Sequence, residues 1–337
     1  MPSPTILLGI ESSCDETAAA VLVDGVVRSN VIAGQDVHRL WGGVVPELAS
    51  RAHQENIVPV VNEALRIAGV DKRDLSAVAV TQGPGLIGAL LVGACFARSF
   101  AQALRIPLLA VDHMQAHVLA HFIRDADDRA VPEFPFLNLT VSGGHTLIVL
   151  VRGPLDMEVV GTTLDDAAGE AFDKGAKVLG LPYPGGPLID QNARDGDPTR
   201  YKLPAPRIEG LDMSFSGVKT AFYNLVRTGQ ASDPAFVERE LPHLCASLQQ
   251  CIIDILLRKL QKAGRTLGVP RIAISGGVSA NSGLREQVQQ LAKREGRAVH
   301  IPPLAYCTDN GAMVAMAGQF LYQAKRFADL DMVPHPR

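Results

Sequence analysis

Two histidines four residues apart are the feature of this sequence best suited to metal chemistry. His113 and His117 occur in the stretch Asp-His-Met-Gln-Ala-His, and residues at this spacing lie on one face of a helix. Two imidazoles on one face can bind the same divalent metal ion. Two histidines that merely cap or line an ordinary helix are the simpler interpretation of so short a pattern. A metal site therefore requires a third ligand elsewhere in the chain.

The same stretch excludes the hydrolysis that zinc peptidases perform with this histidine spacing. Those enzymes need a glutamate directly after the first histidine as the general base. Met114 occupies that position and Gln115 follows it. Neither side chain can take a proton from water, so the pair can hold a metal but cannot run that reaction.

The best candidate for a third metal ligand is Asp309, in the polar segment Cys-Thr-Asp-Asn-Gly-Ala-Met. This segment lies between an apolar, strand-like run (298–304) and a helix of small residues (311–320). His121 continues the histidine series, but eight helical residues would place it about 12 Å from His113. Two imidazoles and one carboxylate would leave positions open for water or a ligand phosphate.

The elements that must position these residues occur twice along the chain. Apolar strand pairs with a polar turn are expected at 6–23 and at 136–151, and strand–glycine turn–helix units at 77–104 and at 271–293. Glycine turns of this kind let backbone N–H groups approach a phosphate at a helix N-terminus. The repeat predicts a duplicated α/β domain with a nucleotide in the cleft between its halves.

The second half of the repeat is longer than the first, which predicts an insertion at about 162–225. The insertion contains a segment with a helical pattern (165–174) and a turn-rich segment (182–187). The charged, proline-bearing segment 124–135 is the expected crossover between two domains.

Composition bounds the class of protein. A chain of 337 residues with 47% hydrophobic and 20% charged residues predicts a soluble protein of two domains. No signal peptide is expected, and the apolar segment 86–104 is expected to be a buried helix, with no membrane association. The cysteines are odd in number and lack metal-site spacing, which predicts a cytoplasmic protein; they are Cys14, Cys95, Cys245, Cys251 and Cys307.

The net charge of −3 gives no overall nucleic-acid signature, but one segment is basic. Residues 258–297 hold nine lysines and arginines against two glutamates. Solvated helix faces account best for most of these charges. A contact surface for the phosphates of a tRNA is the alternative.

Seven motifs in order resemble the TsaD family, the bacterial tRNA adenosine threonylcarbamoyltransferases. The resemblance covers essentially the whole chain, beginning at GIESSCDET; the motifs are HMQAH, VSGGHT, DDAAGEAFDK, YPGGP, SFSGVK, SGGVSANSGLR and CTDNGAM. It implies the actin-like, sugar-kinase-like ATPase fold, with two ribonuclease-H-like domains around a nucleotide cleft. The first domain would comprise 1–130 with the C-terminal helix at 310–337, and the second 131–309.

The resemblance also implies the activity. The family transfers the threonylcarbamoyl group from threonylcarbamoyladenylate to the N6 amine of the adenosine next to the anticodon, in tRNAs that read codons beginning with A, and releases AMP. It implies one divalent metal ion, most readily Fe²⁺, with Zn²⁺ and Mg²⁺ as alternatives. The implied partners are tRNA, a TsaB-like paralogue and a TsaE-like ATPase.

Matching the motifs residue by residue assigns the expected site. The metal ligands would be His113, His117 and Asp309. The substrate-binding positions would be Thr140, Val141, Ser142, Gly143, Gly144, Asp173, Gly186, Asp190 and Asn281. The general base stays unassigned.

Each substrate-binding position also has an ordinary structural interpretation. Asp173 could pair with Lys177 on a helix, Gly186 could serve a turn, and Asn281 could cap a helix. Three other functions compete with acyl transfer: a metal-dependent glycopeptidase, a small-molecule kinase of the same fold with Asp15 or Asp166 as base, and an actin-type scaffold.

Overall fold

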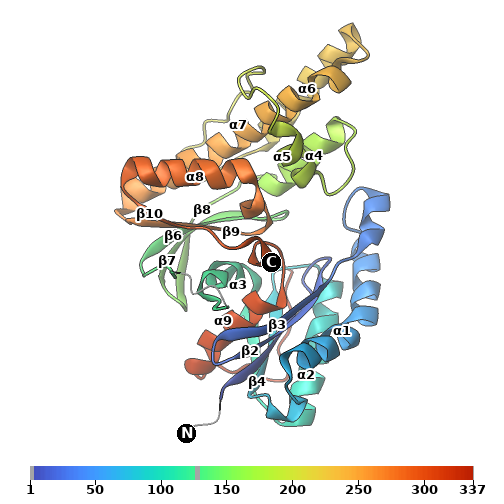
Figure 1. Ribbon diagram of the computed structural model, residues 1–337, viewed down its shortest axis with the longest axis vertical. Helices are drawn as coiled ribbons and strands as arrows, with labels where there is room; N and C mark the ends of the chain where they lie inside the picture. The colour runs from blue at the N-terminus through green and yellow to red at the C-terminus, as the bar shows by residue number, and fades with distance from the viewer. Residues whose placement is uncertain (1–3, 126–129, 337) are drawn as a thin grey trace. The chain divides into compact units, whose positions relative to one another are not determined.

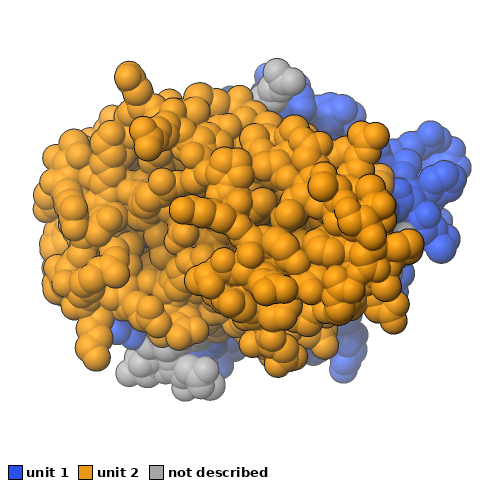
Figure 2. All heavy atoms as spheres, turned by 90° about the horizontal axis from the view of Figure 1, so that it is seen from above, with its two compact units in different colours: residues 1–131, 308–337 blue, residues 132–307 orange. Residues whose placement is uncertain are grey.

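The computed structural model describes residues 4–125 and 130–336, and it divides into two compact units (Figure 1). Unit 1 comprises Met1–Val131 with Thr308–Arg337, and unit 2 comprises Pro132–Cys307; Figure 2 colours them separately. Part of the expected crossover at 124–135, residues 126–129, lies outside the described residues.

Unit 1 is built on a five-stranded sheet in the order β3-β2-β1-β4-β5. The first three strands are antiparallel, whereas β4 lies parallel to β1 and β5 parallel to β4. Every residue of β1 is buried, as expected for a strand covered on both faces. The strands are β1 (Ile6–Glu11), β2 (Thr17–Val23), β3 (Val26–Ala33), β4 (Ala77–Gly83) and β5 (Leu108–Asp112).

Helices cover both faces of this sheet. Leu8 and Ile10 of β1 share an apolar cluster with residues of α1 and α2, whereas Gly9, which points the opposite way, lies against the backbone of α9. Helix α9 therefore packs on the sheet of unit 1. The helices are α1 (Pro46–Ala68), α2 (Ile87–Leu104), α3 (His113–Leu119) and α9 (Gly311–Gln323), with 3-10 turns η1 (Asp36–Trp41), η2 (Lys72–Asp74) and η3 (Ala120–Phe122).

Unit 2 has a second five-stranded sheet, in the order β10-β9-β6-β7-β8. Matched strand for strand, its order and directions repeat those of unit 1, because β6 pairs antiparallel with β7 and parallel with β9. The predicted duplication is therefore confirmed. The strands are β6 (Phe136–Val141), β7 (Thr146–Gly153), β8 (Asp156–Thr162), β9 (Arg271–Ser275) and β10 (Ala298–His300).

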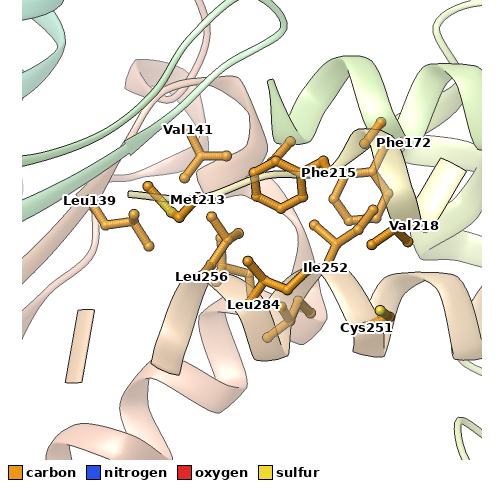
Figure 3. Packing of buried hydrophobic residues seen from close by; sticks show 14 of the residues in the cluster. Leu139, Val141, Phe172, Met213, Phe215, Val218, Cys251, Ile252, Leu256 and Leu284 are labelled. Atoms are coloured by element: carbon orange, nitrogen blue, oxygen red, sulfur yellow. The ribbon is translucent and has the colours of Figure 1, made fainter. Parts of the chain in front are cut away.

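The core of unit 2 lies between its sheet and its helices (Figure 3). Leu139 of β6, Phe172 of α4, Ile252 of α7 and Leu284 of α8 are all buried in one cluster. The helices are α4 (Ala168–Val178), α5 (Gly185–Ala193), α6 (Ser216–Ser232), α7 (Phe236–Leu267) and α8 (Ser282–Glu295), with 3-10 turns η4 (Gly277–Ala280) and η5 (Leu304–Tyr306).

Two sequence expectations fail locally. The helix expected over 165–174 begins only at Ala168, because the Asp165 carboxylate instead accepts hydrogen bonds from the backbone N–H groups of Phe215 and Ser216, where α6 begins. The strand-like run 298–304 is a strand only as far as His300, because two prolines follow and cannot donate ladder hydrogen bonds.

Helix α2 is long and apolar enough to cross a membrane by length and composition, and 33% of it is buried. One face of the helix packs inside unit 1 with small residues, among them Ala94, Ala97 and Ala101. Ile87 and Leu91, which lie one turn apart, are exposed on its other face. The helix that was expected to be buried is therefore exposed on this face.

Candidate functional site

Two helix starts position the predicted metal ligands in unit 1. Helix α3 begins at His113 directly after β5, and Asp112 caps it by accepting a hydrogen bond from the Gln115 N–H at 2.8 Å. Asp309 directly precedes Asn310, which caps α9 in the same way. Because α3 packs against α9, both histidines and the aspartate come together.

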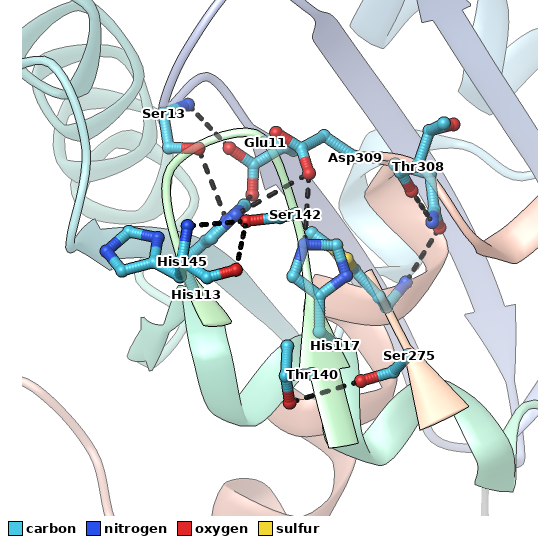
Figure 4. Close-up of polar contacts among 12 residues, drawn as sticks. Glu11, Ser13, His113, His117, Thr140, Ser142, His145, Ser275, Thr308 and Asp309 are labelled. Atoms are coloured by element: carbon cyan, nitrogen blue, oxygen red, sulfur yellow. Dashed lines mark hydrogen bonds and ion pairs between the residues drawn. The ribbon is translucent and has the colours of Figure 1, made fainter. Parts of the chain in front are cut away.

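The three side chains have the geometry of a metal site (Figure 4). The Nε2 atoms of His113 and His117 lie 3.5 and 3.1 Å from Oδ1 of Asp309. One ligand atom from each residue lies within 4.8 Å of the other two. Bonds of about 2.1 Å to one ion place neighbouring ligand atoms roughly 3–3.5 Å apart. The triad therefore needs only a small adjustment to enclose a metal ion.

The buried state of His117 supports a metal at this position. Its side chain is fully buried, and among the described residues neither ring nitrogen makes a hydrogen bond, although Nε2 lies 3.1 Å from Oδ1 of Asp309. A buried polar atom without a partner costs free energy, and native structures rarely leave one. A metal ion bound to Nε2 would satisfy one of these nitrogens, so the residues present fit the group.

Glu11, at the end of β1, holds the ring of His113 from the other side (Figure 4). Its Oε2 lies 3.1 Å from Nδ1 of His113, and it also accepts a hydrogen bond from the Thr81 hydroxyl at 2.6 Å. A carboxylate at Nδ1 fixes the imidazole tautomer so that Nε2 can face a metal. The sequence interpretation missed Glu11; its signal was an acidic residue that ends a buried apolar strand.

Electrostatics at the triad favour a cation. Burial lowers the pKa of His113, but the carboxylates of Asp309 and Glu11 more than compensate and raise it to about 9. Burial raises the pKa of Glu11, yet His113 outweighs this effect and the net pKa is lowered. Burial and the negative charges of Asp309 and Asp15 raise the pKa of Glu16 to about 10. Such crowding of carboxylates is relieved by a bound divalent cation.

The position that a zinc peptidase needs for its general base belongs to the core. Met114 is 9% exposed, and it lies on the same short helix as both histidines. The side chain at this position therefore belongs to the packing of unit 1 and cannot accept a proton.

The glycine turn of unit 2 is open on its outer side. Ser142 N–H donates to the His145 carbonyl at 2.8 Å, which closes the turn between β6 and β7. Gly143 and Gly144 are exposed, and a Cβ atom on either would meet nothing within 4 Å. Neither has a positive φ. These glycines are therefore not required by the local backbone, and the space beside them is free for a ligand.

Two other glycines bring neighbouring segments against this turn. A Cβ atom on Gly169, in the first turn of α4, would lie 2.4 Å from the Ser142 carbonyl oxygen. Gly276 has a φ of 84°, and a Cβ atom there would lie 2.4 Å from the Val141 carbonyl oxygen. Only glycine permits both close approaches. The start of α4 and the loop before α8 therefore both pack on the end of β6.

Two carboxylates, those of Asp173 and Asp190, bind backbone N–H groups at the starts of α5 and α8. Asp173 accepts hydrogen bonds from the backbone N–H groups of Gly185 and Gly186 at 2.8 and 3.1 Å, where α5 begins. Asp190 of α5 accepts from the N–H and hydroxyl of Ser282, where α8 begins. Asn281 caps α8 through Leu284 N–H, so its ordinary structural role is confirmed.

The structure thus gathers most of the predicted substrate-binding positions of unit 2 into one region. Several of these side chains are nevertheless buried: Thr140 and Val141 fully, within β6, and Asp190 and Asn281 nearly so, at 8% exposed. Thr140 is held by the side chains of Asn138 and Ser275. The helix-start N–H groups named above are already bound by Asp173, Asp190 and Asn281, whereas the backbone at Gly143 and Gly144 is open.

Comparison with known proteins identifies the family to which this chain belongs. The TsaD family model, described as tRNA N6-adenosine threonylcarbamoyltransferase, matches residues 26–316. The proteins of that name from Cytophaga hutchinsonii and Porphyromonas gingivalis are 55% and 53% identical to this chain. The first alignment covers 98% of this chain and 95% of the relative, and the second covers 100% and 99%.

Solved structures of low sequence identity share the fold. Full-length HypF has a TM-score of 0.62 at 11% identity, over 96% of this chain and 47% of HypF. Component A of the (R)-2-hydroxyglutaryl-CoA dehydratase of Acidaminococcus fermentans has a TM-score of 0.54 at 14% identity, over 93% of this chain and 96% of that protein. The fold is the predicted actin-like ATPase fold. The protein is an acyltransferase that modifies tRNA, and its chain belongs to the tRNA N6-adenosine threonylcarbamoyltransferase family.

Proposed function

We propose that the protein transfers the threonylcarbamoyl group of L-threonylcarbamoyladenylate to the N6 amine of the adenosine next to the anticodon. The substrates are tRNAs that read codons beginning with A. The amine nitrogen bonds to the carbamoyl carbon, the bond from that carbon to the phosphate oxygen breaks, and AMP leaves with the electron pair. The amine loses one proton, for which we assign no general base.

The observation that carries this proposal is the triad of the buried His113 and His117 with the partly buried Asp309. Two imidazoles and one carboxylate hold a metal and leave coordination positions open. A divalent metal bound there would supply positive charge to the phosphate of the adenylate. The donor is already an activated anhydride, so the reaction needs no nucleophilic side chain and no peptidase glutamate.

The adenylate is proposed to bind on unit 2 at the glycine turn. The open space beside Gly143 and Gly144 lets a ligand approach the backbone closely. Asp173 and Asp190 hold the starts of α5 and α8 and so preserve the shape of this surface. Their remaining lone pairs suit the ribose or threonyl hydroxyl groups.

We propose Fe²⁺ as the metal, on the basis of the family resemblance. Two imidazoles and one carboxylate also suit Zn²⁺, whereas Mg²⁺ prefers sites made of oxygen ligands. Metal analysis of the purified protein, with Zn²⁺ and Mg²⁺ measured in the same sample, tests this assignment.

We further propose a cytoplasmic protein that works with a TsaB-like paralogue and a TsaE-like ATPase. The exposed apolar side chains of Ile87 and Leu91 on α2 support a protein partner, because clustered exposed apolar residues mark interaction surfaces. Association of the purified proteins, measured for wild type and for Leu91→Glu, tests this surface.

A kinase is the weaker alternative on this structure. Asp166, one of its two candidate bases, pairs with Lys174 and Lys219 at 2.9 and 3.0 Å. Burial raises the pKa of Asp166, but the two lysines lower it overall. A carboxylate held this way is a poor proton acceptor.

Mass analysis of tRNA nucleosides after depletion and rescue tests the proposed function. Rescue with the wild-type protein is expected to restore threonylcarbamoyladenosine, and rescue with His117→Ala is not. Arg51→Ala, which alters only an exposed helix pair, serves as the matched control and is expected to rescue fully. Unchanged nucleoside levels after depletion would contradict the proposed function.

A further inference from the structure

We propose that a basic groove between α4 and α6 of unit 2 binds the single-stranded anticodon loop of the tRNA. Lysine and arginine side chains would contact backbone phosphates, and Tyr223 would stack on an unpaired base. The inference deepens the proposed tRNA modification and rests on it. It assigns a binding surface that the adenylate and metal positions do not provide.

The groove has a volume of about 630 Å³, and both helices contribute to it. Helices α4 and α6 pack against each other, so their facing side chains line one depression. Four of the lining residues are cationic and none is acidic. The residues that carry the argument are Lys174, Lys177, Val178, Lys219, Tyr223 and Arg227.

The spacing of these residues forms a stripe along α6. Lys219, Tyr223 and Arg227 are successive residues four apart, so they lie on one face of the helix. Eight residues of helix separate the first cation from the last by about 12 Å. That length exceeds the roughly 3.4 Å of axis per phosphate on one nucleic-acid strand, so the stripe can reach several phosphates.

Two of the cations are fixed and two are available. Lys174 and Lys219 share the carboxylate of Asp166, and Lys174 also contacts Glu170 at 2.8 Å. Lys177 and Arg227 are both exposed, and neither takes part in an ion pair among the described residues. Their uncompensated charge attracts a polyanion such as RNA.

The aromatic side chain indicates the kind of RNA. Tyr223 is 50% exposed between two cations, with the apolar side chains of Val178 and Val226 also lining the groove. Sequence-tolerant binding of unpaired nucleotides combines a basic groove with aromatic rings on which bases stack. Double-stranded RNA is bound mainly through its shape and backbone and does not need such a ring. An unpaired loop therefore fits this groove best.

The basic segment 258–297 is less suited to the same task. Six of its nine cations already bind groups within unit 2. Arg265 and Arg297 bind the carboxylate of Glu295, and Arg271 binds that of Glu133. Backbone carbonyls accept from the other three: that of Asp254 from Arg258, those of Ile208 and Gly210 from Lys259, and those of Ser279 and Pro302 from Arg285. Lys293 and Arg294 remain exposed on α8. They provide a charge-matched control on another helix of the same unit.

The experiment measures binding of unmodified tRNA to the full-length protein across a salt series. Lys177→Glu/Arg227→Glu is expected to weaken binding and to lower the slope of log affinity against log salt by about 1.4–1.8, since each phosphate contact contributes about 0.7–0.9. Tyr223→Ala is expected to weaken binding about 5- to 100-fold with little change of slope, and Tyr223→Phe to bind like wild type. The control Lys293→Glu/Arg294→Glu is expected to keep the wild-type slope.

Two further readouts keep the result interpretable. All variants change exposed helix positions, so melting temperature and metal content should match wild type, and AMP affinity should be unchanged. A wild-type slope in the groove variant, an equal loss in the control, or a loss of AMP binding in place of tRNA binding would each overturn the groove assignment. Failure of the wild-type protein itself to bind or modify tRNA would instead contradict the proposed function.

Discussion

Replacement of Glu11 by glutamine tests how the chain prepares His113 for a metal. Glu11 is fully buried and its carboxylate accepts hydrogen bonds from Ser13 N–H and the Thr81 hydroxyl while its Oε2 faces Nδ1 of His113. Glutamine has nearly the same shape but only one acceptor oxygen, so it cannot serve all three donors. The His113 ring then loses the carboxylate that selects its tautomer.

The expected loss follows from comparable groups behind metal-bound histidines. Removing such a partner weakens metal affinity about 10- to 100-fold, or about 1.4–2.8 kcal/mol. A buried donor left without an acceptor costs roughly a further 1–3 kcal/mol of folding stability. Glu11→Gln should therefore lower both the metal affinity and the melting temperature.

Competition between the protein and a chromophoric chelator for Zn²⁺ measures the affinity directly. Thr81→Val is the matched control, since it removes a hydrogen bond to Glu11 and leaves the carboxylate on His113. The control should lose stability but little metal affinity. Equal Zn²⁺ affinities in wild type and Glu11→Gln would refute the orienting role of Glu11.

Three further changes have defined outcomes. The double change of His113 and His117 to alanine should remove bound metal while the fold survives, because alanine favours helix; full metal occupancy by elemental analysis would contradict the triad. Gly143→Val should abolish adenylate binding in a direct titration with little loss of melting temperature, because its side chain would fill the open space beside the turn; wild-type affinity would place the ligand elsewhere. Asp166→Asn should cost about 1 kcal/mol at neutral pH, since its partners are partly exposed. The folded-state pKa of Asp166 is lowered, so this contribution is present above about pH 4 and is lost as the pH falls further. Denaturant unfolding should therefore show the difference at pH 7 and a smaller one near pH 3, and a constant difference would contradict the ion-pair account.

Local patterns were enough to predict the duplicated fold and the residues of the candidate metal triad, which the structure brings together. Apolar runs interrupted by polar or glycine-rich turns indicate both strand pairs and both strand–turn–helix units, since burial on two faces leaves little choice of residue. His113 and His117 lie on one face of α3, as their spacing predicted. Asp309 was predictable only as a polar residue near a helix start, because its partners are nearly 200 residues away in the chain.

Contacts between distant segments could not be predicted from the sequence. The role of Glu11 depends on the pairing of β1 with β4 and of β4 with β5, which places His113 beside it. Gly169 and Gly276 are ordinary glycines in the sequence, and only the packing of α4 and of the loop before α8 shows why no larger residue fits. Asp165 appeared helical by pattern, whereas its carboxylate binds the start of a helix 50 residues later.

The division of unit 1 between the two ends of the chain has a consequence for synthesis on the ribosome. Domains emerge and fold from the N-terminus onward. Residues of unit 1 up to Val131 appear first, but α9, which covers one face of their sheet, comes last. During the interval in which unit 2 is translated, that apolar face lacks its covering helix and awaits either a chaperone or the remaining chain. Asp309 also follows unit 2 in the chain, so a nascent chain cannot bring the three candidate ligands together before unit 2 has been translated.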